Sequence, residues 1–425
     1  MIQNRLGHLR RSSVLAVVWL ATRAWVYLQL NIQQGTHVDF QDVNLFGSWT
    51  NLLNSQHVLP SGSAWQYPPG AVFVFLLPGA FPVPHSVVYL LLFAMCDALI
   101  FILLLVAELK QPGLGIWVWI AGFPLLLTLP LLRFDVVPTA AAVAALVLAK
   151  SRRHGGWVGV AVGIGAAIKV WPVVAIFSLT RRRSIAWGTA AAAFVCCASL
   201  IVVEILFGHA LSFVSNQSGR GLEIEAVGAT PWYVLQAVAG KPVVWAPRNG
   251  SLELTSEKAD ALAVVLHILM IAIAVAIAAA WLVIIRSSLA DRQRVQLGIE
   301  LTYVAVLAFV VLSPVLSPQY FIWLLGVAAV VMTKRTSALR LSVLFLVASV
   351  ALTTALLGVW GGLISNGSQA AYFLVARNVV LVAALVEAAR QITLETLPLW
   401  KSQLLHRTRI VDRRATEPIS DSTLL

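Results

Sequence analysis

Long runs of apolar residues recur along the whole chain, and they constrain its fold more than any other feature. A helix needs about 20 residues to cross a hydrocarbon core about 30 Å thick, and many of the runs approach that length. Only 11% of the residues are charged, which excludes a water-soluble globular protein. We expect an all-α, polytopic membrane protein of about twelve transmembrane helices. The runs lie at roughly 13–31, 86–107, 114–131, 135–149, 157–168, 171–180, 185–207, 260–285, 298–313, 319–333, 339–361 and 371–389.

The net charge of +12 comes largely from basic residues in short segments between these runs. Basic residues in short loops prefer the cytoplasmic side, so the segments indicate the orientation of the chain. Both termini are then expected in the cytoplasm of a cell-membrane protein. The basic residues do not form a patch with interleaved aromatic residues, so nucleic-acid binding is not expected. The segments contain Arg10 and Arg11; Lys110; Lys150, Arg152 and Arg153; Arg181, Arg182 and Arg183; Arg286, Arg292 and Arg294; Lys334, Arg335 and Arg340; and the tail from Arg390.

Two neighbouring runs, 157–168 and 171–180, are too short to span comfortably, and basic clusters lie on both sides of the pair. A short hairpin with Lys169 at its outer tip fits this charge pattern. The alternative is one kinked span through Lys169 and Pro172, which would invert the topology of everything downstream.

Two segments expected on the outer face, 32–84 and 208–259, are much longer than turns. The first contains no Lys or Arg, and its apolar piece 71–81 is too short to span, which predicts a re-entrant or interfacial helix. We expect one integral-membrane catalytic domain over 1–400, which includes both outer loops. A basic cytoplasmic tail without a core of its own follows at 401–425.

Asp42 lies a few residues beyond the outer end of the first run, where a carboxylate would face the membrane boundary. A partly desolvated carboxylate can act as a general base towards a hydroxyl group. The alternative is structural: Asp42 caps a helix, and Asp39 is a solvated loop residue.

Two further outer turns carry charged groups. Arg133 and Asp135 flank Phe134 between two runs, where they form a structural ion pair or face a polar cavity. At the hairpin tip, the Lys169 ammonium would attract a lipid phosphate or extend to the membrane interface.

The second long loop contains Gly219-Arg220-Gly221, in which glycines allow close approach to a guanidinium group. Arginine is suited to bidentate phosphate binding, although pairing with Glu223 or Glu225 is an equal alternative. Further on, the turn Ser317-Pro318-Gln319-Tyr320 offers hydroxyl and amide groups that could reach a sugar.

Taken in order, these segments resemble integral-membrane glycosyltransferases of the GT-C class that use polyprenyl-phosphate sugars. They are most similar to the polyprenyl-phosphomannose-dependent α-mannosyltransferases of actinobacteria, glycosyltransferase family 87. Two departures are Glu223, where glutamine is common, and Ala226, where a serine usually follows; arabinofuranosyl transfer also occurs among relatives. The resemblance runs from Asp42 to Trp323 and rests on Asp42; Tyr67-Pro68-Pro69; Arg133-Phe134-Asp135 with Pro138; Lys169 with Pro172; Arg220-Gly221-Leu222-Glu223-Ile224-Glu225; and Ser317-Pro318-Gln319-Tyr320.

The resemblance implies that a sugar moves from a polyprenyl-phosphate donor to a hydroxyl of a glycolipid or glycan acceptor on the outer face. Mannose is the first candidate for this sugar. Displacement would be inverting, with Asp42 as general base and Asp39 as the second candidate. The expected partners are membrane lipid, donor and acceptor; no cofactor and no metal are expected. The donor-phosphate ligands would be Lys169, Arg220 and Arg133, and the substrate-binding residues Tyr67, Asp135, Glu225, Gln319 and Tyr320.

Two other classes of protein share this composition. A transporter or flippase of a lipid-linked or anionic substrate also places ionisable groups within helices, but such folds usually show repeated halves. Here the loops are strongly asymmetric. A receptor or scaffold would make the outer-face position of Asp42, Lys169 and Arg220 accidental.

Overall fold

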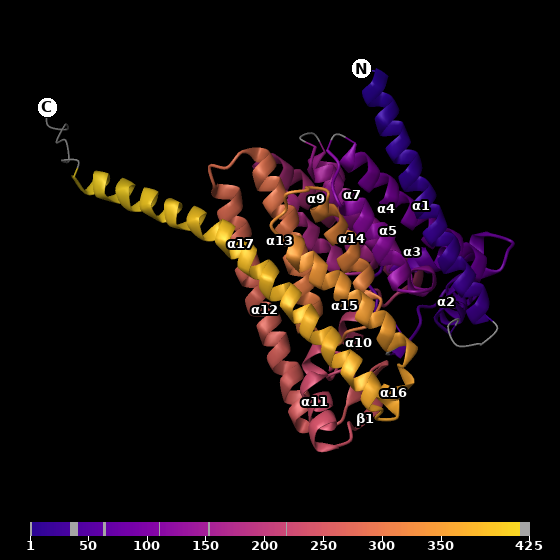
Figure 1. The fold of residues 1–425 in the computed structure, drawn as a ribbon. Helices are drawn as coiled ribbons and strands as arrows, with labels where there is room; N and C mark the ends of the chain where they lie inside the picture. Colours follow the sequence, from indigo (N-terminus) through magenta and orange to yellow (C-terminus); the bar gives the residue numbers. More distant parts are fainter. Residues whose placement is uncertain are drawn as a thin grey trace.

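The computed structural model describes residues 2–34, 41–62, 65–109, 111–151, 154–217 and 219–416. Long helices lie side by side in one bundle, and the N-terminal end of α1 and the C-terminal end of α17 project from it (Figure 1). The strands in these ranges form one small antiparallel hairpin, in which Trp245 pairs with Leu254. The expected all-α, polytopic architecture is therefore confirmed.

Helices occupy each apolar run that the sequence delimits. In the first half of the chain they are α1 (Ile2–Gln34), α2 (Gln41–Asn51), η1 (Leu52–Gln56), α3 (Ala71–Leu76), η3 (Leu77–Ala80), α4 (His85–Glu108), α5 (Gly115–Leu125), α6 (Leu129–Leu132), α7 (Val136–Ala149), α8 (Gly155–Ile168), η4 (Trp171–Ser178) and α9 (Arg182–Phe207). The second half contains α10 (Ser212–Gln217), η5 (Val227–Ala229), α11 (Thr230–Ala239), β1 (Trp245–Arg248), β2 (Ser251–Leu254), α12 (Glu257–Arg286), α13 (Asp291–Leu312), α14 (Tyr320–Met332), α15 (Arg340–Gly358), α16 (Gly361–Ile364) and α17 (Ser368–Thr416).

Among the described residues, seven helices are long and apolar enough to cross a membrane. They are α1, α4, α9, α12, α13, α15 and α17. The remaining predicted runs form shorter apolar helices, namely α5, α7, α8, α14 and the 3-10 helix η4. The expected number of about twelve spans is therefore not confirmed, although the chain is a multi-pass membrane protein.

The centre of the bundle is formed by α13 and α14. The most apolar window of α13 is 83% buried, whereas that of α12 is 11% buried. In α14, every residue from Phe321 to Met332 is buried. A helix that is apolar on all sides is expected inside the protein, and α14 is shielded from lipid by its neighbours.

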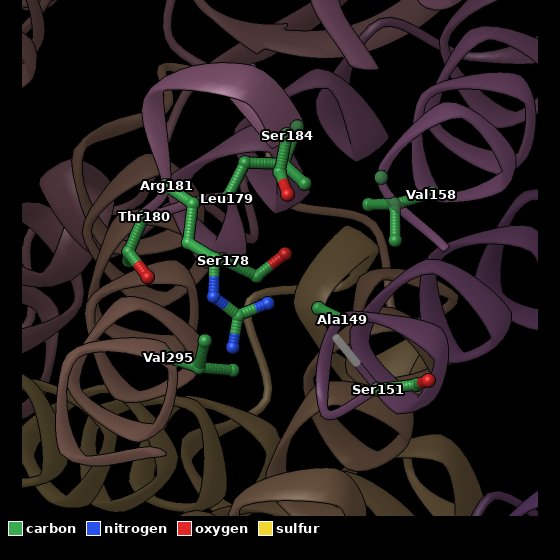
Figure 2. A pocket seen from close by; sticks show the side chains of 10 residues that line it. Ala149, Ser151, Val158, Ser178, Leu179, Thr180, Arg181, Ser184 and Val295 are labelled. Atoms are coloured by element: carbon green, nitrogen blue, oxygen red, sulfur yellow. The ribbon is translucent and has the colours of Figure 1, made fainter. Parts of the chain in front are cut away.

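The two short runs around Lys169 form a hairpin, as the charge pattern predicts. Helix α8 leads to Lys169 and η4 returns, so that Gly155 and Leu179 both lie against Gly188 of α9. The hairpin ends help to line a pocket of about 10 Å³, room for one water molecule, where the Arg181 side chain extends past Ser178 towards Val295 (Figure 2). This geometry excludes the single kinked span.

Small residues let α8 and α9 pack closely. A β-carbon on Gly159 would lie 2.0 Å from the carbonyl oxygen of Gly188, and one on Gly163 would lie 2.9 Å from that of Ala192. Contacts therefore advance in the same direction along both helices, which run parallel. Glycines four residues apart allow this backbone contact in membrane helices.

The two long segments that are expected on the outer face contain several short helices. The first holds α2, η1, α3 and η3, so the short helix predicted at 71–81 is observed over Ala71–Ala80. The second holds α10, η5, α11 and the β-hairpin. Helix α17 continues without a break past residue 400 to Thr416, so no helix end marks the expected start of the tail.

Candidate functional site

Four connections between helices bring the predicted site residues to one end of the bundle. Asp135 immediately precedes α7, and Lys169 follows α8. Helices α7 and α8 pack against each other, so these two residues meet where one helix begins and the other ends. The first turns of α14 add Tyr320 and Trp323, and the segment before α3 adds Tyr67.

Lys169 lies at the centre of this site, between a buried carboxylate and several aromatic rings. Its Nζ donates a 2.6 Å hydrogen bond to Asp135 Oδ1, and Trp323 Nε1 donates to the same oxygen at 2.6 Å. Four aromatic rings surround the ammonium group, with centroids 4.9 to 5.7 Å from Nζ; we refer to Tyr67, Phe134, Tyr320 and Trp323 as the aromatic cage. Ring faces attract cations at such distances.

Asp42 lies in the first turn of α2 and forms an ion pair with Arg133, with 2.5 Å between Oδ2 and the guanidinium. The local pair of Arg133 with Asp135, one alternative from the sequence, does not form in the described structure. Instead, Arg133 reaches Asp42 and Asp135 reaches Lys169, so each ion pair joins separate segments of the chain. Asp39 lies outside the described residues.

The Tyr67-Pro68-Pro69-Gly70 segment packs directly on the end of α8. A β-carbon on Gly70 would lie 2.7 Å from backbone atoms of Ala167, so this approach requires glycine. The contact places the Tyr67 ring edge-on to Phe134, with centroids 4.9 Å apart. Burial raises the pKa of Tyr67, and its phenol stays protonated.

Arg220 belongs electrostatically to the same site. Burial lowers the pKa of Lys169; Asp135 opposes this change, and the positive charges of Arg133 and Arg220 contribute to it. We call Arg133, Lys169 and Arg220 the cation cluster. No ion pair joins Arg220 to Glu223 or to Glu225 within the described ranges.

The two glutamates after Arg220 have other partners. Glu223 accepts a 2.7 Å hydrogen bond from the Leu316 amide, and burial together with the charge of Glu225 raises its pKa to about 8. Glu225 pairs with the fully buried Arg377 at 3.1 Å and accepts from Trp360 Nε1 at 2.8 Å. Glu225 thus ties the second long segment, 208–259, to α17.

Several buried polar atoms of the site have no hydrogen-bond partner in the part of the chain that the structure describes. Buried polar groups are normally satisfied, because an unmade hydrogen bond costs about 1–3 kcal/mol. Such a concentration indicates a place where a polar ligand supplies the missing partners. The atoms are Arg133 Nε, Asp135 Oδ2, Trp171 Nε1, Arg220 Nε and Gln319 Oε1.

Three residues of the site and its supports are not among those that the sequence predicts: Trp171, Phe134 and Arg377. Trp171 stacks on Trp323 with centroids 5.3 Å apart, and only the fold reveals this contact. Arg377 had a detectable signal, because an arginine within an apolar run is costly unless it has a partner. The other predicted residues Tyr67, Asp135, Gln319 and Tyr320 lie around Lys169 or next to residues that contact it.

The family model of glycosyltransferase family 87 matches the chain over residues 65–318. The match covers more than half of the 425 residues. The chain belongs to glycosyltransferase family 87. No curated protein and no solved structure matches it.

The family match includes most of the site. It contains Tyr67 and the complete cation cluster, and it ends at Pro318, just before Gln319. Asp42 precedes the matched region, so its role depends on its contact with Arg133 rather than on the match. The resemblance inferred from the sequence is thus confirmed at the level of a membrane glycosyltransferase family.

Proposed function

We propose that this membrane glycosyltransferase moves a sugar from a polyprenyl-phosphate donor to a hydroxyl of a glycolipid or glycan acceptor. Mannose is the first candidate for this sugar. The observation that carries the proposal is the group of unpartnered polar atoms around the cation cluster. We further propose that this site faces the outer side of the cell membrane and that both termini lie in the cytoplasm.

The charge balance of the site suits a phosphate ester. Three cations, Arg133, Lys169 and Arg220, are accompanied by two carboxylates, Asp42 and Asp135. Glu223, with a pKa of about 8, is mostly protonated at neutral pH and adds little negative charge. One positive charge therefore remains, which matches the single negative charge of a phosphodiester donor. The leaving polyprenyl phosphate carries more negative charge than the donor, so the cluster stabilises the departing group more strongly than it stabilises the bound donor.

The proposed reaction is an inverting displacement at the anomeric carbon. Asp42 accepts the proton of the acceptor hydroxyl, and the oxygen of that hydroxyl forms the new bond to the anomeric carbon. The bond from the anomeric carbon to the phosphate oxygen breaks, and the polyprenyl phosphate departs with the electron pair. Arg133 links the two ends of this reaction, because it contacts the proposed base and belongs to the cation cluster.

Substitution of the proposed base tests the mechanism. Asp42→Asn is expected to lower transfer of radiolabelled mannose from polyprenyl-phosphate mannose to a lipid-extract acceptor by at least 100-fold, since general-base catalysis contributes about 10²- to 10⁴-fold. The measurement uses purified protein in lipid nanodiscs, with product identified by mass spectrometry.

Asp39→Asn is the matched control for this experiment. Activity close to that of the wild type is expected, whereas a loss confined to Asp39→Asn would move the base to that residue. Lys169→Met should also abolish transfer because it removes a phosphate ligand. Full activity of Asp42→Asn would contradict the proposed mechanism, and no transfer by the wild type with any polyprenyl-phosphate sugar would favour transport.

A further inference from the structure

A second hollow lies between the C-terminal end of α9 and α10, apart from the cation cluster. Its volume is about 460 Å³, within the range of small-ligand sites. It is lined by Leu200, Glu204, His209, Leu211, Ser212 and Ser215.

The turn that forms this hollow is fixed by Glu204. The Ala210 amide donates a 2.8 Å hydrogen bond to Glu204 Oε2, and the Gly208 amide donates to the Glu204 carbonyl at 3.0 Å. Gly208 and His209 both have positive φ, at 67° and 53°. This sharp reversal brings His209 and the first residues of α10 back towards Glu204.

The parallel packing of α8 and α9 sets the height of the hollow relative to Lys169. Gly163 of α8 lies level with Ala192 and Val195 of α9. Lys169 is six residues beyond Gly163, so Glu204 lies about 5 to 9 Å further along the bundle axis at 1.5 Å per residue. The hollow is thus displaced beyond the level of the cation cluster, in the direction in which α8 runs.

Helix α10 connects the hollow to the site through one intermediate residue, Trp65. Asn216, one residue after Ser215, donates a 2.8 Å hydrogen bond to the Trp65 carbonyl. Trp65 lies edge-on to Tyr67 of the aromatic cage, with centroids 5.9 Å apart. Helix α10, which lines the hollow, is therefore linked through Trp65 to a residue of the aromatic cage.

The lining suits a sugar better than a phosphate. A carboxylate, an imidazole and two hydroxyls can exchange hydrogen bonds with sugar hydroxyls, and the two leucines fit its apolar C–H face. The Glu204 carboxylate would repel an anionic headgroup. Beside the hollow, Ile201 and Ile205 of α9 and Val214 of α10 are 56%, 76% and 58% exposed, an apolar surface for a lipid chain.

We infer that this hollow binds the sugar headgroup of a membrane-anchored glycolipid, as the acceptor subsite of the enzyme. The assignment of the hollow as an acceptor subsite rests on the proposed transfer reaction, whereas sugar binding is inferred from the lining alone. The lipid chain would remain along α9 while a headgroup hydroxyl extends towards Asp42.

Photolabelling tests the subsite without requiring catalysis. The probe is octyl α-mannoside with a diazirine in its alkyl chain, applied to wild-type protein in nanodiscs, and labelled peptides are identified by mass spectrometry. We expect labelling within residues 200–216. Leu211→Trp fills the hollow and should reduce this labelling at least tenfold, and Glu204→Gln should weaken it severalfold. Val238→Trp, an exposed position on α11, is the matched control and should leave it unchanged.

The controls separate this inference from the proposed function. Asp42→Asn should label like the wild type, because it retains the hollow. Equal labelling by a diazirine-bearing octanol would show that only the alkyl chain binds, and undiminished labelling in Leu211→Trp would place the probe elsewhere; either result overturns the subsite. Loss of transfer with normal labelling would instead contradict the proposed reaction alone.

Discussion

Asp97 in α4 shows how a charge is kept at membrane depth when it has only a structural task. Its carboxylate accepts hydrogen bonds from the Arg23 guanidinium at 2.7 and 2.8 Å, and from Trp19 and Trp119 at 3.1 and 2.7 Å. Arg23 also donates to the Ile120 carbonyl at 3.2 Å. Both oxygens of Asp97 are satisfied, whereas Oδ2 of Asp135 lacks a partner among the described residues. This contrast separates a structural pair from a candidate site.

Breaking the structural pair should destabilise the protein without a direct effect on chemistry. Asp97→Asn leaves the buried Arg23 uncompensated and is expected to cost about 3–5 kcal/mol of unfolding free energy. Thermal unfolding in detergent micelles measures the loss. The double variant Arg23→Gln with Asp97→Asn should recover a large part of it, because the two changes are coupled. Additive losses would show that the pair contributes no coupling.

The raised pKa of Glu223 predicts a pH-dependent stability. In the unfolded chain this carboxyl ionises near its ordinary value of 4.5, while in the folded protein it retains its proton up to about 8. Unfolding between these values releases a proton, so stability falls as the pH rises, by at most about 1.4 kcal/mol per unit.

Glu223→Gln removes this ionisation and can still accept the hydrogen bond from Leu316. Melting temperatures measured from pH 5 to pH 8 should therefore decline less in the variant than in the wild type. Parallel curves for the two proteins would assign the pH dependence to other groups. Glutamine is also the residue common at this position in the family that the sequence resembles.

At the scale of elements, the pair α8 and α9 positions Lys169. Glycine contacts hold the two helices together, and the returning η4 packs against α13, where a β-carbon on Gly298 would lie 2.3 Å from the Phe177 carbonyl oxygen. The hairpin tip is thus supported from both sides. A shift of α8 would move Lys169 relative to Asp135.

Gly159→Ala tests this support. Its β-carbon would lie 2.0 Å from the Gly188 carbonyl oxygen, so the helices must separate, at an expected cost of about 1–3 kcal/mol. Sugar transfer should fall together with the melting temperature. Gly156→Ala is the matched control, since a β-carbon there meets no atom within 4 Å. Equal behaviour of the two variants would argue against helix contact as the positioning element.

At the scale of the whole molecule, the ion pairs of the site and its supports join distant parts of the chain. Asp42 and Arg133 are 91 positions apart by their numbers, and Glu225 meets Arg377 across 152 positions. The site is therefore assembled by the complete bundle. Removal of α17 would leave Glu225 buried without its arginine.

The proposed orientation of the bundle predicts which surfaces face the outside. Cysteine introduced at Val238, on exposed α11, should react with a membrane-impermeant maleimide added to intact cells, in a background without native cysteines. Cysteine at the exposed Arg335 should react only after permeabilisation. The reverse pattern would place the cation cluster on the cytoplasmic side and contradict the proposed outer-face reaction.

Much of the helical arrangement could be predicted from apolar runs, because a chain in lipid must satisfy its backbone hydrogen bonds internally. Asp42, Arg133 and Lys169 were also identifiable as charged groups at run ends. Their pairing was not, because Arg133 has a carboxylate two residues away and nevertheless reaches Asp42. Interhelical register decides such choices, and a single sequence does not contain it explicitly.

The sequence by itself determined that this protein lies in a membrane, that it is helical, and to which family it belongs. Hydropathy and local motifs are properties of neighbouring residues, so a single sequence contains them. Only the tertiary structure decided the hairpin at Lys169, the aromatic cage, and the partners of Asp135 and Glu225. These features depend on side chains that meet across separate helices. Packing distances, such as the contact of Gly159 with Gly188, determine where those side chains meet.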